Sequence, residues 1–180
     1  VLLPQRGLRW IRGEATPEEL PGGGTLWHGY VSDISDLKRV EEELRALSIT
    51  DSLTGIYNRR YFQDRLRAEI ARLNRTQGAL SVIMLDVDHF KRINDKHGHA
   101  VGDGVLQELC SRIGQRLRRT DVFCRFGGEE FMVLCPTTDA EQAYSLALEL
   151  WQSLRSAPMD PVGVVTASFG VASWRGDGGI

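Results

Sequence analysis

The sequence predicts an α/β domain in which helices flank a mixed central sheet, and three patterns carry this prediction. A continuous apolar run over residues 79–85 is typical of a strand that is buried on both faces. Apolar runs over 121–124 and 131–135 lie on either side of a Gly-Gly pair, as in a tight hairpin. Amphipathic segments lie between these strands, and their apolar sides have to be covered by the sheet.

The first 35 residues indicate two strands and a loop. Short apolar patterns over 8–12 and 25–31 are separated by Pro17, Pro21 and three glycines. Two strands cannot make a core of their own. The chain starts without methionine and stops after a strand-like run, so we expect it to be part of a longer protein.

A helix is expected over residues 36–49. Its apolar positions recur three and four residues apart, with charged residues between them, and they are Leu37, Val40, Leu44 and Leu47. Two heptads do not distinguish a coiled-coil dimer from an amphipathic helix that lies on its own domain. Both interpretations remain open at this point.

The remaining elements follow in alternation. Cap and turn residues over 51–60 interrupt the first helix. The expected order is then helix, strand, helix, strand, strand, helix, strand, with helices at about 60–74, 105–119 and 140–155 and a last strand at 164–172.

The hairpin contains a local conflict. Gly127 and Gly128 are expected to supply the positive φ that both central positions of a two-residue loop require. Glu129 and Glu130 then open the return strand, although strands disfavour Glu and neighbouring like charges repel. The conflict is explained either by a bound cation or by a turn with a solvated acidic edge, and these residues alone leave both open.

A second acidic group follows the strand over 79–85. Asp86 and Asp88 lie at its carboxyl end, where open α/β sheets tend to bind ligands. If this strand neighbours the hairpin, Asp86 and Glu129 lie side by side on strands about 4.8 Å apart, and their carboxylates can share a divalent cation. Oxygen ligands without His or Cys favour magnesium over zinc. Asp88 is expected to be a solvated helix cap instead.

Composition excludes several functional classes. Of 180 residues, 42% are hydrophobic and 26% charged, which is typical of a globular domain. A net charge of −2 gives no field that would attract a nucleic acid. No apolar run is long enough to span a membrane and no signal peptide is evident, so we expect a cytoplasmic location. Three cysteines, Cys110, Cys124 and Cys135, lie in apolar patterns without C-x-x-C spacing and are expected to be buried and reduced.

Four motifs in order, between about Thr50 and Ala172, resemble the GGDEF-domain diguanylate cyclases. They are Asp51-x-Leu53-Thr54-Gly55-x-x-Asn58-Arg59-Arg60, Asp86-x-Asp88-x-Phe90-Lys91-x-x-Asn94-Asp95, Gly98-His99-x-x-Gly102-Asp103 and Arg125-x-Gly127-Gly128-Glu129-Glu130-Phe131. This resemblance implies the condensation of two GTP into cyclic di-GMP. It also implies a fold with a ferredoxin-like core, similar to nucleotidyl cyclases and polymerase palms.

The same resemblance implies roles for single residues. Asp86, the Val87 carbonyl and Glu129 would hold Mg²⁺, which Mn²⁺ could replace. Glu129 or Glu130 would help to remove the 3′-hydroxyl proton. Lys91 and the amides near His89 and Phe90 would stabilise the phosphate charge. The nucleoside would be contacted by Asn94, His99 and Asp103.

Regulation is implied as well. Arg118-Arg119-Thr120-Asp121 has the R-x-x-D form of the family's inhibitory product site. Arginines near a helix C-terminus are also favoured by the helix dipole, which is the alternative explanation. Because each domain is expected to bind one GTP, the enzyme would work as a homodimer.

Three parts of the chain are therefore expected. The run Gly29-Tyr30-Val31-Ser32-Asp33-Ile34-Ser35-Asp36-Leu37-Lys38 resembles the C-terminal edge of a PAS sensor domain, so residues 1–35 are expected to be the remnant of such a domain. Residues 36–49 are expected to form a signalling linker helix, and 50–180 the GGDEF domain, stopping before the family's last helix. The alternative is a catalytically silent module that binds GTP or cyclic di-GMP and relays a PAS signal. Degenerate members of the family lose the signature acids, whereas Asp86, Glu129 and Glu130 are present here.

Overall fold

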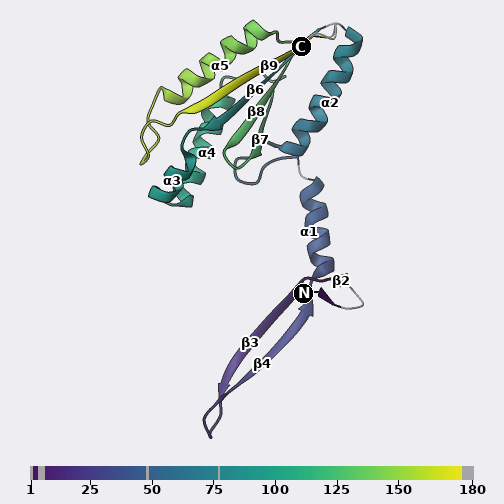
Figure 1. The fold of residues 1–180 in the computed structure, drawn as a ribbon, viewed down its shortest axis with the longest axis vertical. Helices are drawn as coiled ribbons and strands as arrows, with labels where there is room; N and C mark the ends of the chain where they lie inside the picture. Colours follow the sequence, from purple (N-terminus) through teal and green to yellow (C-terminus); the bar gives the residue numbers. More distant parts are fainter. Residues whose placement is uncertain (1, 4–6, 48, 77, 176–180) are drawn as a thin grey trace. The chain divides into compact units, whose positions relative to one another are not determined.

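The structure is a computed structural model that describes residues 2–3, 7–47, 49–76 and 78–175. The chain divides into two compact units, Val1–Ser48 and Ile49–Ile180 (Figure 1). Each unit is described by itself below. In the part of the chain that is described, no helix has both the length and the apolar character needed to cross a membrane.

The first unit is built on a two-stranded ribbon. β3 (Ile11–Glu19) pairs antiparallel with β4 (Thr25–Asp33), and the much shorter β1 (Leu2–Leu3) pairs with β2 (Gly7–Leu8). The predicted strand over 8–12 was therefore wrong in its bounds, because β3 continues through Pro17. Both strands of a two-stranded ribbon are edge strands, where the missing N–H of proline is tolerated. The ribbon leads into α1 (Ser35–Leu47).

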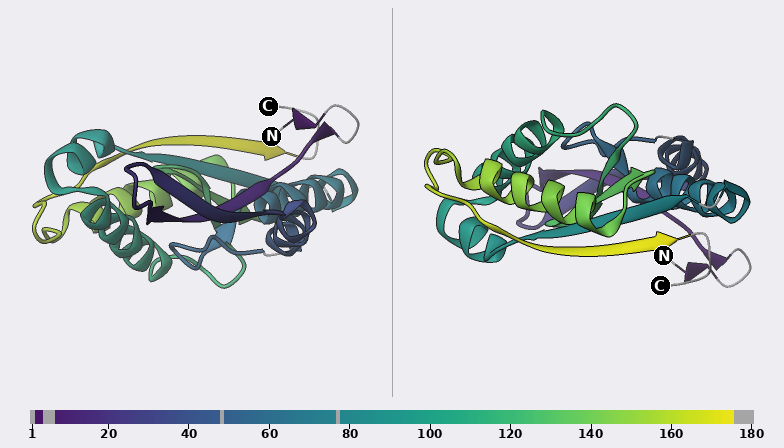
Figure 2. Two further views of the ribbon diagram at one scale, coloured as in Figure 1. Left: turned by 90° about the horizontal axis from the view of Figure 1, so that it is seen from below. Right: turned by 90° about the horizontal axis from the view of Figure 1, so that it is seen from above.

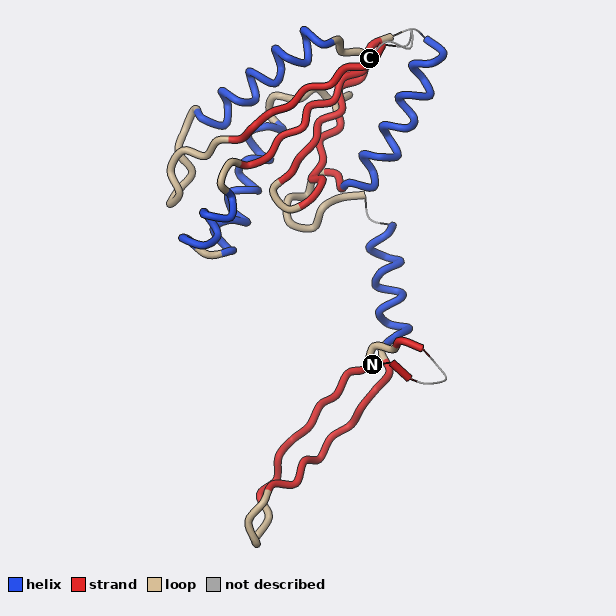
Figure 3. The backbone as a smooth tube through the Cα atoms, in the orientation of Figure 1, coloured by secondary structure: helices blue, strands red, loops and turns tan. Residues whose placement is uncertain are grey.

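The second unit contains a five-stranded mixed sheet in the order β5-β7-β8-β6-β9. β5 pairs parallel with β7, and all other neighbours are antiparallel. With their connecting helices, the last four strands follow the ferredoxin-like βαββαβ order, which confirms the predicted fold class (Figure 3). The strand bounds are Tyr57–Asn58 for β5, Ala79–Val87 for β6, Val122–Gly127 for β7, Glu130–Pro136 for β8 and Ala167–Arg175 for β9.

Helices cover both faces of this sheet. On one face, α4 (His99–Gly114) and α5 (Ala140–Arg155) bury a large core against alternate residues of the central strands, among them Ile83 and Val133. On the other face, α2 (Arg59–Thr76) packs Phe62 and Leu73 against Leu80 and Leu134. The further views in Figure 2 show the same arrangement. Because β6 and β8 contribute to both cores, their positions are fixed from two sides.

The segment after β6 differs from the prediction. The stretch over 99–104, which contains two glycines, is helical, so two helices, α3 (Phe90–His97) and α4, replace the single helix expected at 105–119. Gly102 is buried at the contact between them, and a Cβ there would collide with Oδ1 of Asn94. The glycine therefore serves close packing of two helices and does not break one.

The three cysteines are free and buried, as predicted. Burial raises the pKa of Cys110, Cys124 and Cys135 to about 12 in each case. A thiolate is the reactive form of cysteine, so these side chains act as small apolar groups of the core.

Candidate active site

Acidic residues from two strands meet at one edge of the sheet. In the register of β6 with β8, Asp86 lies opposite Glu130. The Val87 N–H donates to the Glu129 carbonyl over 3.3 Å, so the residue after Asp86 and the residue before Glu130 are also neighbours. Asp86, Glu129 and Glu130 are all half-buried. The backbone positions of these three acidic residues thus meet where β6 ends and β8 begins.

The hairpin turn differs by one residue from the prediction. Gly127 pairs with Glu130, a bulge interrupts the ladder between Arg125 and Gly127, and the turn itself consists of Gly128 and Glu129. Of the two glycines only Gly128 has positive φ, at 29°, so the expectation of positive φ at both was wrong. Glu129 lies in the turn, where the strand's aversion to Glu does not apply. The irregular ladder places it beside β6.

Arg125 holds this turn through its side chain. Its Nε donates to the Gly128 carbonyl over 2.9 Å, and its Nη1 lies 3.3 Å from Oδ1 of Asp51. The same carboxylate oxygen accepts the N–H and the hydroxyl of Thr54 at 2.9 and 2.7 Å. Burial alone would raise the pKa of Asp51, but the Thr54 hydrogen bonds and the Arg125 charge outweigh it and leave the pKa below its ordinary value. Arg125 therefore ties the hairpin to the turn that begins at Asp51.

Arg125 belongs to one of the four sequence motifs, but its role could not be predicted from the sequence. Its acceptors belong to its own turn and to a residue 74 positions away. Such a pair leaves no local pattern. The one signal available was a charged residue within an otherwise apolar strand, which suggests a buried partner.

Asp88 fastens β9 to the end of β6. Its carboxylate accepts the hydroxyls of Thr166 and Ser168 at 2.6 and 2.7 Å, and its N–H donates to the Thr166 carbonyl over 2.9 Å. These hydrogen bonds, with Thr166 first, hold the pKa of Asp88 below its ordinary value. The expectation of a solvated helix cap was therefore wrong. The N-cap position of α3 is occupied by His89, whose side chain makes no capping bond.

The start of α3 lies directly after β6, beside the carboxylates. His89 adopts the left-handed conformation at φ 57°, which turns the chain sharply into the helix. The ring of Phe90 is buried in the core, so only its main chain is available to a ligand, whereas Lys91 is exposed. The first N–H groups of a helix have no acceptor within it, and they favour anions.

The α3–α4 pair holds the remaining predicted residues. Asn94 has a buried Oδ1 that accepts no hydrogen bond from the described residues. Asp103 is exposed on α4, next to the Gly102 contact with Asn94, and His99 is the exposed first residue of that helix. A buried acceptor without a donor is costly unless a ligand or water supplies one. Asn94 therefore suits a ligand that carries N–H donors.

The donor set at the sheet edge fits a hard divalent cation. Asp86 and Glu129 offer carboxylate oxygens and Val87 offers a carbonyl oxygen, whereas no nitrogen or sulfur ligand belongs to the set. Among the described residues there is no cluster of three or more His, Cys, Asp or Glu side chains arranged to hold a metal. Few protein ligands, completed by water and substrate phosphates, are what Mg²⁺ sites commonly have.

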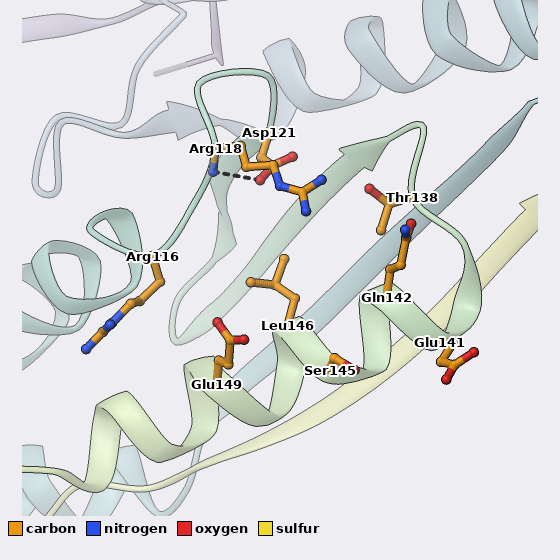
Figure 4. A pocket seen from close by; sticks show the side chains of 9 residues that line it. All are labelled: Arg116, Arg118, Asp121, Thr138, Glu141, Gln142, Ser145, Leu146 and Glu149. Atoms are coloured by element: carbon orange, nitrogen blue, oxygen red, sulfur yellow. Dashed lines mark hydrogen bonds between the residues drawn. The ribbon is translucent and has the colours of Figure 1, made fainter.

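A separate hollow of about 380 Å³ lies at the opposite end of β7, between the loop after α4 and one side of α5 (Figure 4). Arg118 and Asp121 line it, and the Arg118 N–H donates to Oδ2 of Asp121 over 2.8 Å. Burial raises the pKa of Asp121 although Arg118 lowers it in part. The R-x-x-D segment is therefore a folded turn at the mouth of a pocket.

Comparison with known proteins agrees with these motifs. A family model described as "Diguanylate cyclase, GGDEF domain" matches residues 48–179. The chain belongs to the GGDEF diguanylate cyclase family. The resemblance noted in the sequence is confirmed for this part of the chain, while that of residues 1–35 to a PAS sensor remains a prediction.

GGDEF relatives cover most of the chain. This chain is 41% identical over 140 residues to the diguanylate cyclase DgcP of Pseudomonas aeruginosa, with 76% of this chain and 21% of DgcP aligned. It is 35% identical over 170 residues to the diguanylate cyclase DgcM of Escherichia coli K12, with 94% and 41% aligned. The chain thus spans about a fifth to two fifths of the length of these GGDEF proteins.

A solved GGDEF structure has the same fold. The GGDEF domain of DgcB from Caulobacter crescentus, in complex with c-di-GMP, superposes with a TM-score of 0.69 at 30% identity. The match covers 72% of this chain and 80% of that one.

Proposed function

We propose that this GGDEF unit condenses two GTP molecules into cyclic di-GMP with release of two diphosphates. The observation that carries the proposal is the meeting of Asp86 and Val87 with Glu129 and Glu130 at one sheet edge. Phosphoryl transfer needs positioning and charge neutralisation more than covalent chemistry, and this edge provides the ligands for a cation. Family membership points to the same reaction.

In this mechanism Asp86, the Val87 carbonyl and Glu129 would hold Mg²⁺, or Mn²⁺ in its place. The bound metal would polarise the α-phosphate and favour the attacking 3′-oxygen. Glu129 or Glu130 would accept the proton of the 3′-hydroxyl.

The phosphates would lie against the start of α3. There the first N–H groups of the helix, near His89 and Phe90, would donate to phosphate oxygens, and Lys91 would add a positive charge. Both features lie next to the metal ligands along the chain, because α3 follows β6 after two residues.

The base would be read between α3 and α4. Guanine carries N–H donors at N1 and N2, and Asn94 Oδ1 and the Asp103 carboxylate would accept them, with His99 beside the nucleoside. Adenine would leave these acceptors unpaired, which is the strongest kind of discrimination that a binding site can offer.

The product has two phosphodiester bonds, and each unit would bind one GTP, so two units have to face one another. We therefore propose a homodimer, with α1 as the element that joins the two copies. We also propose that cyclic di-GMP binds the pocket at Arg118 and Asp121 and slows turnover. Residues 1–35 would be the end of a PAS sensor that controls a cytoplasmic enzyme.

The decisive experiment is incubation with GTP and Mg²⁺ followed by chromatographic detection of cyclic di-GMP, for the unaltered protein and for Glu129→Gln. Glu129→Gln removes a charge without changing shape, so cyclisation should fall by about two orders of magnitude or more while the fold is kept. Glu108→Gln, on the exposed side of α4, is the matched control and should leave turnover unchanged. Near-normal turnover in Glu129→Gln would refute the metal assignment. GTP binding without turnover in the unaltered protein would support the silent-module alternative.

A further inference from the structure

The pocket at Arg118 has two unlike walls. The loop wall carries Arg116 and Arg118 together with Asp121. The wall formed by α5 carries two carboxylates, Glu141 and Glu149, separated by uncharged residues, and among the residues that line the pocket α5 contributes no cation. A ligand that enters therefore meets positive charge on one side and negative charge on the other.

The two carboxylates of α5 are not equivalent. In Figure 4, Glu149 rises from the helix toward the side on which the arginines lie, whereas Glu141 points away from them. Both side chains are exposed. The salt bridges between described residues include neither Glu149 nor Arg118. The charge of Glu149 is consequently not neutralised before a ligand arrives.

A cyclic dinucleotide carries two phosphodiester anions. Arg118 would attract them, and Glu149, across a hollow of only about 380 Å³, would repel them. A hollow of this volume is about as wide as the Debye length of roughly 8 Å at physiological salt, so the repulsion is only partly screened. Like-charge contacts of this kind lower the affinity of a site for its ligand.

We infer that Glu149 sets the affinity of this pocket for cyclic di-GMP at a low value, so that feedback begins only at raised product concentration. The inference rests on the proposed product site at Arg118 and Asp121. According to this inference, a side chain of α5, which is distant from the R-x-x-D turn in sequence, determines how strongly that turn binds its anion.

Calorimetric titration of cyclic di-GMP into the unaltered protein and into Glu149→Gln tests this directly. Removing one opposed charge at this range should tighten binding by about three- to tenfold. Glu149→Arg, which also adds a cation, should tighten it further. Glu141→Gln is the matched control, with the same chemical change on the same helix, and should alter the affinity by less than about twofold.

Salt separates this charge effect from a change of shape. The difference between the unaltered protein and Glu149→Gln should shrink between 50 mM and 500 mM NaCl, because a Coulomb term is screened and a packing term is not. Equal affinities at low salt would overturn the inference. Weaker binding by Glu149→Gln would overturn it as well, and would indicate that the carboxylate accepts hydrogen bonds from the guanine edge.

Arg118→Ala distinguishes failure of this inference from failure of the proposed site. If Arg118→Ala abolishes binding while Glu149→Gln changes nothing, the product site stands and the role of Glu149 falls. If Arg118→Ala binds as tightly as the unaltered protein, or if no form binds, the product site itself falls and the inference with it.

Discussion

At the scale of single residues, Arg125 joins two turns that are 74 positions apart in the sequence. Its side chain is only 17% exposed and that of Asp51 only 23%, so water competes weakly for the charged groups. An ion pair in such a setting fixes geometry more than it adds stability, because both charges lose part of their hydration. We therefore regard Arg125 as a residue that positions the hairpin.

Arg125→Ala should impair the enzyme without unfolding it. The change removes the donor to the Gly128 carbonyl and the positive charge beside Asp51, which keeps only its hydrogen bonds from Thr54. The free energy of unfolding should fall by about 1–3 kcal/mol. Turnover should fall more than GTP affinity does, because the hairpin carries Glu129. Urea unfolding and steady-state kinetics measure the two effects.

A double-mutant cycle with Asp51→Asn provides the control for this prediction. If Arg125 acts through Asp51, the two changes together should cost less than their sum. Fully additive effects would show that Arg125 acts through another contact.

At the scale of elements, the α3–α4 pair depends on a glycine that reads as a helix breaker. Gly102 and Gly104 both lie inside α4. A Cβ at Gly102 would strike Asn94 and the ring of Phe90, whereas a Cβ at Gly104 would meet nothing within 4 Å. The same substitution at the two positions therefore has opposite consequences.

Gly104→Ala should raise the free energy of unfolding by about 0.5–1 kcal/mol, because alanine is the better helix former. Gly102→Ala should lower it by about 1–3 kcal/mol, because the added methyl group displaces Asn94. The displaced Asn94 should also weaken GTP binding. Thermal unfolding and nucleotide titration of both variants check this, and equal stability of the two would contradict the packing seen here.

The lowered pKa of Asp88 predicts that the stability of the folded protein depends on pH. Its pKa in the folded protein lies below the usual value, with the Thr166 and Ser168 hydroxyls as the main cause and His89 adding a favourable charge. A lowered pKa contributes stability above the unfolded-state value of about 3.9, and this is lost as the pH falls through the folded-state value.

Asp88→Asn should therefore be less stable than the unaltered protein near neutral pH, by about 1 kcal/mol for a half-buried carboxylate that solvent still partly screens. The gap should narrow as the pH falls below about 4 and close only when the pH has passed the lowered folded-state pKa of Asp88. Melting temperatures measured across this range decide the question. A gap of constant size down to a pH of about 3 would mean that the charge of Asp88 is not what holds β9.

Particular elements show what sequence alone could predict. α5 was predicted with its correct bounds, since its apolar period is regular and Asp139 and Gln142 form a capping box that marks its start. The α3–α4 boundary could not be predicted, because tertiary contact at Gly102 overrides a weak local propensity. The residues of the site were found through motifs, but the one-residue shift of the hairpin comes from a bulge that has no sequence signature.

At the scale of the whole molecule, α1 carries apolar side chains that the chain itself leaves exposed. Leu37, Val40 and Leu44 are 63%, 47% and 63% exposed, at the spacing of a coiled-coil seam. The side chain of the fourth member, Leu47, lies outside the described residues. Burial of this stripe against a second copy would bring two units together and provide the two GTP sites that the proposed reaction requires.

Placing Asp at both Val40 and Leu44 should raise the dimer dissociation constant by about tenfold or more, because charges would enter an apolar seam. Activity should then fall most at low protein concentration. Arg39→Asp changes the net charge by the same amount on a side chain that is 70% exposed, and should leave the dimer intact. Light scattering checks the mass of each form, and a dimeric double variant would show that α1 is not the seam.

The segment through which the chain enters the second unit is connected to the hairpin strand that carries Arg125 by two separate contacts. Ile49 accepts the N–H of Asn58, which pairs with Arg125 through β5 and β7, and Asp51 reaches the same Arg125 through its side chain. A movement of the backbone at Ile49 can therefore reach Arg125, which holds the turn of Gly128 and Glu129, through a few hydrogen bonds and without passing through either core. The entry segment and the hairpin that carries Glu129 and Glu130 are therefore mechanically coupled, and a displacement at Ile49 should be transmitted to the hairpin.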